Sequence, residues 1–352
     1  MLNGILLTSI NAKCKNCGGH LSYSPEQDCL LCDNCESVDK IEYSNIEEKK
    51  PYHNIVDSDI EEWRLKQKYI KCKSCGSSIL LQNNEISINC SYCDSQNVVL
   101  KEEVAGLYPT KILRFTFDKK GAGDHFCTGV KKKFFVPRPF KKNMPDSKIH
   151  GFYFPAFSFD ADTDSSYSGK LYRNESYTIN GKTYTRKVYF NISGRSTLRL
   201  DNVLVESSAK INQAQMQEIL PYNFENQADF KEEYLFGYTV EQYNENFMQA
   251  TSKARAISDE MVRDKILSKY SYDGVSSLNV NTTYTNEKFA YFMVPVYTFE
   301  YEYKKKKYLN YMNGQNGVLG GGLPVSKIKV TFCTLGVLLF IAMIIAIVLL
   351  CE

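Results

Sequence analysis

The chain has 352 residues, a net charge of +3, 43% hydrophobic residues and 24% charged residues. These are ordinary values for a globular chain, and so small a net charge does not indicate a polyanionic partner. Eight of the 12 cysteines form four CxxC pairs, which in a reducing compartment indicate metal ligands sooner than disulfides. The first residues lack the basic start and long apolar run of a secretory signal, so we expect none.

Two cysteine-rich segments, 1–45 and 69–104, are predicted to be zinc ribbons. Each holds two CxxC pairs separated by fourteen residues, and the second repeats the first at a constant shift of 58 positions. A spacer of this length forms a short hairpin that brings the two pairs together, so that four sulfurs surround one ion at about 2.3 Å. The predicted ligands of two structural Zn²⁺ ions are Cys14, Cys17, Cys32 and Cys35, and Cys72, Cys75, Cys90 and Cys93.

Other interpretations of these cysteines are weaker. Redox pairs or an iron–sulfur cluster would not explain the same paired spacing twice, although an iron-bound ribbon stays open. His20 and Cys29 lie inside the first segment, but the second copy has Ser78 and Ser87 at those positions. The repeat therefore argues against His20 and Cys29 as ligands.

The charge of the ribbon region argues against nucleic-acid binding. Residues 1–100 hold ten basic and fourteen acidic side chains. Two ions, each bound by four thiolates, bring the net charge of this region to about −8. Duplex binding draws its affinity from basic side chains that neutralise phosphates. Protein binding or an architectural role is therefore the better interpretation of the ribbons.

The segment between the ribbons, 46–68, is predicted to be an acidic linker with a short helix. Asp57 or Ser58 could cap that helix, and Trp63, the sole tryptophan, is expected to be a packing anchor on it.

Residues 105–215 and 216–312 are predicted to form two related halves of an α+β body with a mainly antiparallel sheet. The aromatic runs 151–160 and 291–300 superpose at a shift of 140, which aligns Pro155 with Pro295. Their alternation fits half-buried strands that begin near a proline.

Elements around these runs follow from local signals. Asn180-Gly181 predicts a hairpin turn after the first run. Residues 119–133 and 232–269 predict a helix before each run, and the second is the more clearly amphipathic.

The end of the chain predicts a membrane anchor. Residues 330–351 carry no charge, and a helix of this length reaches about 33 Å, enough for a bilayer core of about 30 Å. Lys327 and Lys329 precede this span, so the positive-inside rule places the N-terminal body in the cytoplasm of a single-pass cell-membrane protein. The glycine-rich segment 313–329 is either a flexible tether or an ordered docking turn.

Two basic runs stand out in the body. Most such runs are simply solvated, but near anionic lipid each Lys or Arg can contribute about 1 kcal/mol. A possible lipid-facing patch is Lys304, Lys305, Lys306 and Lys307, and the other run is Lys131, Lys132 and Lys133 with Arg138, Lys141 and Lys142.

No pattern predicts a catalytic site. The chain has no phosphate-cradling G-x-x-x-x-G-K-[ST] loop and no readable Ser/His/Asp arrangement. Asp160, Asp162 and Asp164 alternate at strand spacing, but no glycine turn or closing glutamate completes a calcium loop, so a solvated strand end is favoured. We therefore expect a protein that is not an enzyme, and the sequence identifies no small-molecule substrate.

Four stretches together resemble a bacterial family: KIHGFYFPAFSFDADTDSSYSG, EEYLFGYTVEQY, PVYTFEYEYKKKKY and MNGQNGVLGGGLPVSK. Its members carry two N-terminal zinc ribbons, a tyrosine-rich body and a membrane segment near the C-terminus. They are often labelled TFIIB-type zinc-ribbon proteins and sometimes mislabelled as replication helicases. Asn316 and Val318 depart from the Thr and Lys that the family often has there.

Some relatives in this family look like partners of an SPFH-type scaffold and a PspA-type envelope-stress protein. The resemblance thus implies a membrane-anchored adaptor that recruits cytosolic proteins. The alternative is a zinc-ribbon nucleic-acid-binding protein, related to replication or transcription, that is tethered to the membrane.

Overall fold

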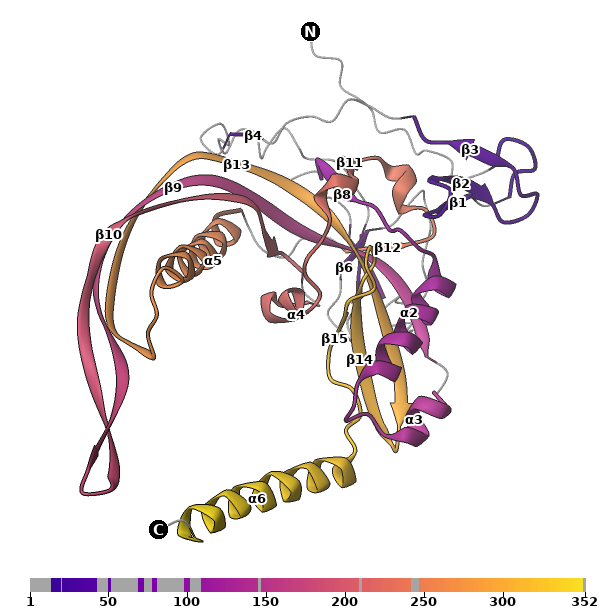
Figure 1. Cartoon of the computed structure of the whole chain (residues 1–352). Helices are drawn as coiled ribbons and strands as arrows, with labels where there is room; N and C mark the ends of the chain where they lie inside the picture. The colour runs from indigo at the N-terminus through magenta and orange to yellow at the C-terminus, as the bar shows by residue number, and fades with distance from the viewer. Residues whose placement is uncertain are drawn as a thin grey trace.

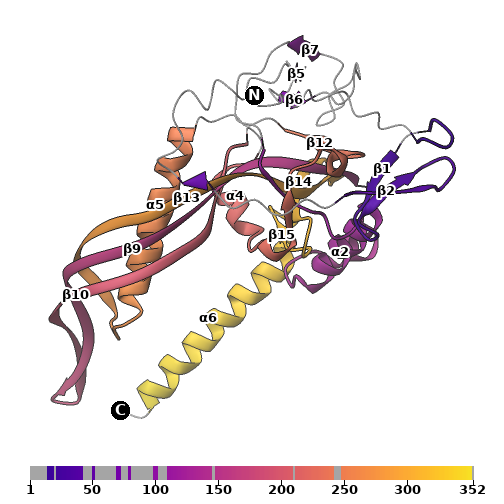
Figure 2. The same ribbon diagram turned by 90° about the horizontal axis from the view of Figure 1, so that it is seen from above.

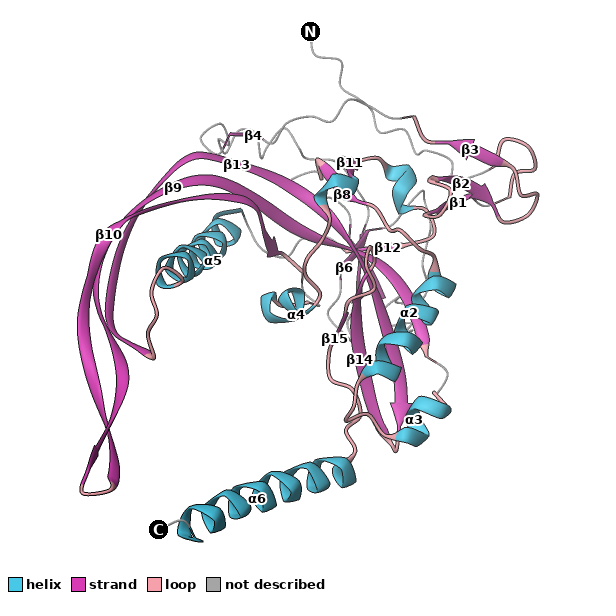
Figure 3. Ribbon diagram, in the orientation of Figure 1, coloured by secondary structure: helices cyan, strands magenta, loops and turns pink. Residues whose placement is uncertain are grey.

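The computed structural model describes residues 14–19, 21–42, 50–51, 69–72, 78–80, 98–101, 109–144, 147–208, 211–241 and 247–350. Its architecture is α+β, as the sequence predicts. Two small three-stranded sheets accompany one large mixed sheet, and the helices of the described residues are α2 to α6 (Figures 1 and 3).

The first small sheet is the hairpin that the cysteine spacing predicts. Strands β1 (Leu21–Ser24) and β2 (Cys29–Cys32) pair antiparallel with Leu21 opposite Cys32, and β3 (Val38–Lys40) adds to β2. Asp28 has a left-handed φ of 49° in the turn between β1 and β2. The hairpin therefore returns the second cysteine pair to the first.

The second small sheet has a different order. Strands β5 (Tyr69–Cys72), β6 (Ser78–Leu80) and β7 (Val98–Lys101) lie in the order β6-β5-β7. Strand β6 matches the position of β1 after the shift of 58, whereas β5 has no counterpart among the described residues of the first ribbon. The predicted linker helix around Trp63 lies outside the described residues.

The large sheet follows the path β10-β9-β13-β14-β15, with β4, β8, β11 and β12 attached beside it. Its strands are β4 (Lys50–Pro51), β8 (Lys111–Leu113), β9 (Lys148–Ile179), β10 (Lys182–Glu206), β11 (Gln227–Asp229), β12 (Thr239–Val240), β13 (Gly274–Tyr303), β14 (Lys306–Asn313) and β15 (Leu319–Gly320). Most pairs are antiparallel, but β12 pairs parallel with β9 and β8 pairs parallel with β13.

The two aromatic runs are the neighbouring strands β9 and β13. They pair antiparallel with Phe157 opposite Tyr291, and each is the first strand of a hairpin. The predicted turn at Asn180 and Gly181 is confirmed, with φ of 51° and 74° as the twist of a two-residue hairpin requires.

These runs are buried on both faces, so the prediction of half-buried strands is wrong. One face packs on helix α2 (Lys119–Lys132), and the other packs on the small helix α4 (Gln213–Glu218) and the segment after it. Phe152 and Phe154 point to the α4 side, while Tyr153 and Phe157 point to the α2 side. Helices on both faces explain why aromatic residues occupy successive positions rather than alternate ones.

The three long strands bend beside Asp160 and Asp162. Pairing shifts on β10 between Leu200 and Val203, and on β13 between Thr285 and Lys288. The Asp160 carboxylate accepts a hydrogen bond from the Asn202 backbone N–H at 2.7 Å, and the Asp162 carboxylate accepts one from the Asn286 side-chain amide at 2.8 Å. Because such bulges bend strands, the sheet curves around helix α5 (Phe247–Leu267), as Figure 1 shows.

The predicted helix over 232–269 is only partly correct. Residues Glu232–Leu235 form a 3-10 turn, and Gly237 leaves it with a φ of 84°. Thr239 and Val240 then add a parallel strand to β9, and α5 begins at Phe247. The first prediction, over 119–133, is confirmed by α2, where Asp118 caps the helix by accepting from the Gly121 N–H at 2.7 Å.

The glycine-rich segment is an ordered docking turn. Strand β15 pairs with β14, and the Asn313 side-chain amide donates to the Ile219 carbonyl at 2.8 Å. Helix α6 (Lys327–Leu350) begins three residues earlier than predicted and is long and apolar enough to cross a membrane. Figures 1 and 2 show that α6 leaves the body at its first turn, on the opposite side from β1–β3.

Candidate metal centre and membrane-proximal surface

The structure brings the first four cysteines together. The sulfur atoms of Cys14, Cys17, Cys32 and Cys35 all lie within 4.8 Å of one another. Across the two pairs, Cys14 and Cys35 are 3.6 Å apart and Cys17 and Cys32 are 3.5 Å apart. These separations are too long for an S–S bond of about 2.05 Å, and four converging thiols could hold one metal ion.

The knuckles that hold these sulfurs are built alike. After the second cysteine of each pair stands a residue in the left-handed region, Gly18 with φ 73° and Glu36 with φ 58°. The Gly18 N–H donates to the Cys14 carbonyl at 2.8 Å, and the Glu36 N–H donates to the Cys32 carbonyl at 3.0 Å. Each CxxC therefore closes a tight turn that faces both of its thiols toward the centre.

Ser37 supports the cluster, and sequence reasoning assigned it no role. Its hydroxyl lies 2.9 Å from the Cys14 sulfur and 3.1 Å from the Cys35 sulfur. These hydrogen bonds lower the pKa of Cys14 and lower the pKa of Cys35 to about 6. A serine at the same place in the second copy, Ser95, is the signal that could have found it.

Of the four predicted ligands of the second ion, only Cys72 lies among the described residues. Cys72 is the last residue of β5, and Cys75, Cys90 and Cys93 lie outside the described residues, so the second centre stays a prediction. Cys29 is outside the four-sulfur group, and its thiol points to the Gln27 side chain at 3.7 Å.

Several contacts hold the first ribbon against the body. Arg114 forms an ion pair with Asp28 in the β1–β2 turn, and Tyr23 also donates to the Asp28 carboxylate at 2.7 Å. The Tyr23 backbone N–H donates to the Phe236 carbonyl at 3.0 Å, and its ring meets Tyr234 edge-on with centroids 5.2 Å apart. The ribbon is thus held by charge, backbone and aromatic contacts together.

The predicted lipid-facing lysines lie at the tip of the β13–β14 hairpin, where Lys304 and Lys305 form the turn and Lys306 and Lys307 begin β14. Lys304 and Lys305 have φ of 51° and 62°, and all four lysines of residues 304–307 are exposed. Tyr303 at the end of β13 meets Phe140 of helix α3 (Arg138–Lys142), with ring centroids 5.1 Å apart. The turn therefore lies against α3.

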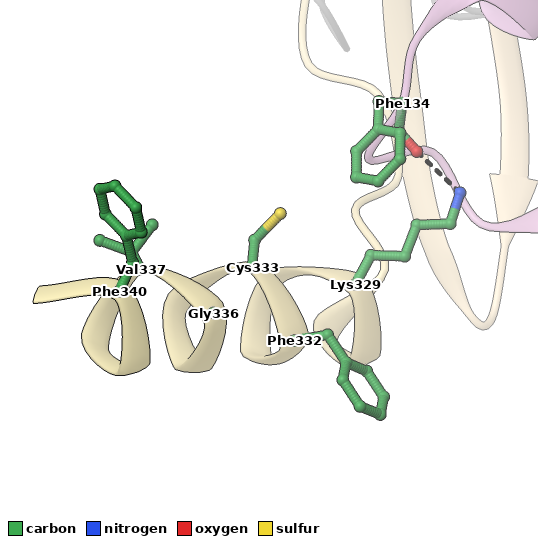
Figure 4. A pocket seen from close by; sticks show the side chains of 7 residues that line it. All are labelled: Phe134, Lys329, Phe332, Cys333, Gly336, Val337 and Phe340. Carbon is green, nitrogen blue, oxygen red and sulfur yellow. Dashed lines mark hydrogen bonds between the residues drawn. The ribbon is translucent and has the colours of Figure 1, made fainter. Parts of the chain in front are cut away.

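The second basic run lies at the base of α6. The ammonium of Lys329, in the first turn of α6, donates to the Phe134 carbonyl at 2.7 Å and the Val136 carbonyl at 2.9 Å. Figure 4 shows Phe134 and Lys329 facing each other beside α6. The α2–α3 loop is thereby joined to the start of the candidate span, which sequence reasoning did not anticipate.

The acidic triplet has a structural role at two of its positions. Asp160 and Asp162 accept the bulge hydrogen bonds described above, and no group of metal-ligating atoms in the described part of the chain includes them. Asp164 lies opposite Thr197 on β10 and opposite Thr283 on β13.

Fold and site together define an α+β protein with a four-cysteine cluster at one end and a helix able to span a membrane at the other. No protein-family model and no solved structure matches the chain. The chain is similar to the uncharacterised protein YdjG of Bacillus subtilis (strain 168), with 26% identity over 333 residues, 91% of this chain and 92% of the relative. The likeness covers nearly the whole of both chains.

Proposed function

We propose that this protein is a non-catalytic membrane-anchored adaptor whose zinc ribbons dock cytosolic proteins at the cell membrane. The observation that carries the proposal is the position of the ordered cysteine ribbon, fixed on the body away from α6. A protein with an anchor at one end and a small rigid module at the other can hold a partner at a set distance from the bilayer.

Zinc is the metal that this donor set favours. Four sulfurs at about 2.3 Å from a tetrahedral ion lie about 3.8 Å from one another, and no position remains for water or substrate. The observed sulfur pairs at 3.5 and 3.6 Å are close to that spacing. The role of the ion is then structural, and the repeated spacing supports a second ion bound by Cys72, Cys75, Cys90 and Cys93.

The partners are proposed to be proteins. Residues 1–100 are acidic in sum, which disfavours phosphate backbones, and the family resemblance points to SPFH- or PspA-type partners in an envelope-stress complex. With α6 in the membrane and lysines before it, the body lies in the cytoplasm.

The test is affinity purification of the full-length protein from detergent-solubilised membranes. Cytosolic proteins should co-purify with the wild type, which should carry about two zinc ions, and Cys32→Ser should lose one ion and those proteins. Cys127→Ser, in α2 and outside the cluster, is the matched control.

Two results would contradict the proposal. Loss of metal without loss of the co-purifying proteins would show that the first ribbon is not the docking module. Recovery of partners only while nucleic acid is intact would favour the tethered nucleic-acid-binding alternative.

A further inference from the structure

Three hydrogen bonds join the loop between α2 and α3 to the first turn of α6 and to Ser326, the residue before it. Besides the two Lys329 bonds, the Ser326 N–H donates to the Phe135 carbonyl at 2.8 Å. The Lys329 ammonium also lies 5.3 Å from the centre of the Phe134 ring. If α6 spans a bilayer, this loop must lie at the level where the helix enters it.

The loop exposes two adjacent aromatic rings. Phe134 is 64% exposed and Phe135 is 45% exposed, while Val136 beside them is buried and holds the loop in place. The two rings meet edge-on with centroids 5.2 Å apart. Large apolar side chains gathered on a surface mark an interaction site, and rings beside a membrane helix fit the headgroup level of a bilayer.

The same segment is strongly basic. Residues 127–144 contain six Lys or Arg side chains and no acidic one. Arg138 and Lys141 lie close enough to Lys329 for their charges to act on its ammonium. Within the described part of the chain none of these cations takes part in an ion pair, so an anion placed among them would relieve their repulsion.

An open groove of about 520 Å³ runs from this cationic point along α6. Figure 4 labels the residues that line it, Phe134, Lys329, Phe332, Cys333, Gly336, Val337 and Phe340. From residue 329 to 340 a helix rises about 16 Å, close to the hydrocarbon depth of one leaflet in a core of about 30 Å. An acyl chain could therefore lie in the groove with its headgroup at Lys329.

We propose that the α2–α3 loop and the start of α6 form a binding surface for an anionic phospholipid of the surrounding bilayer. The phosphate lies among Lys329, Arg138 and Lys141, and one acyl chain lies in the groove. The rings of Phe134 and Phe135 rest at the headgroup level. This inference depends on the part of the proposed function that places α6 across a membrane.

The test uses full-length protein reconstituted into vesicles of phosphatidylglycerol or of phosphatidylcholine. A photoreactive phenylalanine analogue replaces Phe134, and the same analogue at Val38, which is exposed in β3, is the control. Lipid adducts at position 134 should exceed those at position 38 by at least about tenfold, because only the first position lies at the bilayer. They should also be several-fold more abundant in phosphatidylglycerol than in phosphatidylcholine.

Charge is tested in the same vesicles. The double variant Arg138→Gln/Lys141→Gln should reduce the phosphatidylglycerol adduct to the phosphatidylcholine value while the protein stays in the membrane. The matched control, Lys15→Gln/Lys40→Gln on the first ribbon, should leave the adduct unchanged.

The outcomes separate the two proposals. If alkaline carbonate extracts the full-length protein, the membrane anchor is wrong and the phospholipid site with it. If the protein resists extraction but position 134 gives no more lipid adduct than position 38, or equal adducts with both lipids, the anchor stands and the phospholipid site is overturned.

Discussion

Ser37 touches two of the four sulfurs, so one hydroxyl supports both halves of the cluster. Hydrogen bonds to thiolates orient the sulfurs and reduce the competition from protons. Groups that support metal ligands in this way commonly contribute 10- to 100-fold to metal affinity.

We predict that Ser37→Ala loses its first-ribbon metal to a chelator about 10-fold faster than the wild type. The measurement is the rate of metal transfer to a chromophoric chelator. Ser22→Ala is the control, because the Ser22 hydroxyl donates to Asp33 at 2.8 Å rather than to a sulfur. Equal rates in Ser37→Ala and Ser22→Ala would contradict a role for Ser37 at the metal.

Tyrosine side chains that pack inside the body make its stability depend on pH in the alkaline range. Burial raises the pKa of Tyr238, whose ring stacks on Phe115 at 4.2 Å, to about 12. The folded protein keeps this phenol neutral, whereas in the unfolded chain it ionises near the ordinary tyrosine pKa of about 10. The stability it contributes is therefore complete below about pH 10 and is lost as the pH rises to about 12.

We predict that Tyr238→Phe reduces the alkaline loss of the free energy of unfolding by about 3 kcal/mol. A difference of two units between the folded and unfolded pKa corresponds to that energy. Urea unfolding in detergent at about pH 9 and about pH 12 measures the difference. Tyr189→Phe, at an exposed position of β10, should leave the alkaline loss as in the wild type. Equal losses in Tyr238→Phe and Tyr189→Phe would sink the prediction.

Among the helices and strands, the features that local sequence patterns determine were predicted, whereas the features that depend on tertiary contacts were not. The repeat of the aromatic runs located β9 and β13, and Asn180-Gly181 located the hairpin turn between β9 and β10. The start of α5 could not be predicted, because Thr239 and Val240 pair with β9, a strand distant in sequence. Burial on both faces was missed for a similar reason, since it depends on helices that pack from either side.

Strands β9 and β13 approach each other so closely at one position that only glycine fits there. A Cβ on Gly169 would lie 2.5 Å from the Ser277 carbonyl oxygen, beside the bulge of β13 between Val275 and Ser277. Only backbone movement could relieve that clash.

We therefore predict that Gly169→Ala lowers the free energy of unfolding by about 1–3 kcal/mol. Gly322→Ala, where a Cβ meets nothing within 4 Å, is the matched control and should change it by less than about 0.5 kcal/mol. Urea denaturation of both variants in detergent is the measurement. A Gly169→Ala protein as stable as the control would mean that the two strands can separate without cost.

For the whole molecule, the sequence predicted the parts better than their arrangement. The cysteine spacing and the apolar run located the first cluster and α6. The contact between Lys329 and Val136 joins residues 193 positions apart, and the pair Arg114–Asp28 joins residues 86 apart. No local pattern predicts such contacts, because each partner alone looks like an ordinary surface cation or acid.

We predict that Arg114→Leu loosens the first ribbon from the body. Loss of a charged hydrogen bond at a partly buried position costs about 1–2 kcal/mol, which corresponds to roughly 5- to 30-fold faster local opening. Hydrogen exchange of the Tyr23 amide, which bonds the Phe236 carbonyl, reports this opening. Arg186→Leu, which breaks an exposed pair with Glu175, is the control and should not change that exchange.

The hydrogen bonds between the start of α6 and the α2–α3 loop couple the tilt of this helix to the orientation of the body. A helix whose apolar length exceeds the local hydrocarbon thickness accommodates the mismatch by tilting. Because Lys329 in the first turn of α6 and Ser326 just before it are hydrogen-bonded to the body, a tilt of an inserted helix would rotate the body with it. Bilayer thickness would then set how far the cysteine ribbon stands from the lipid, and with it the reach of whatever the ribbon holds.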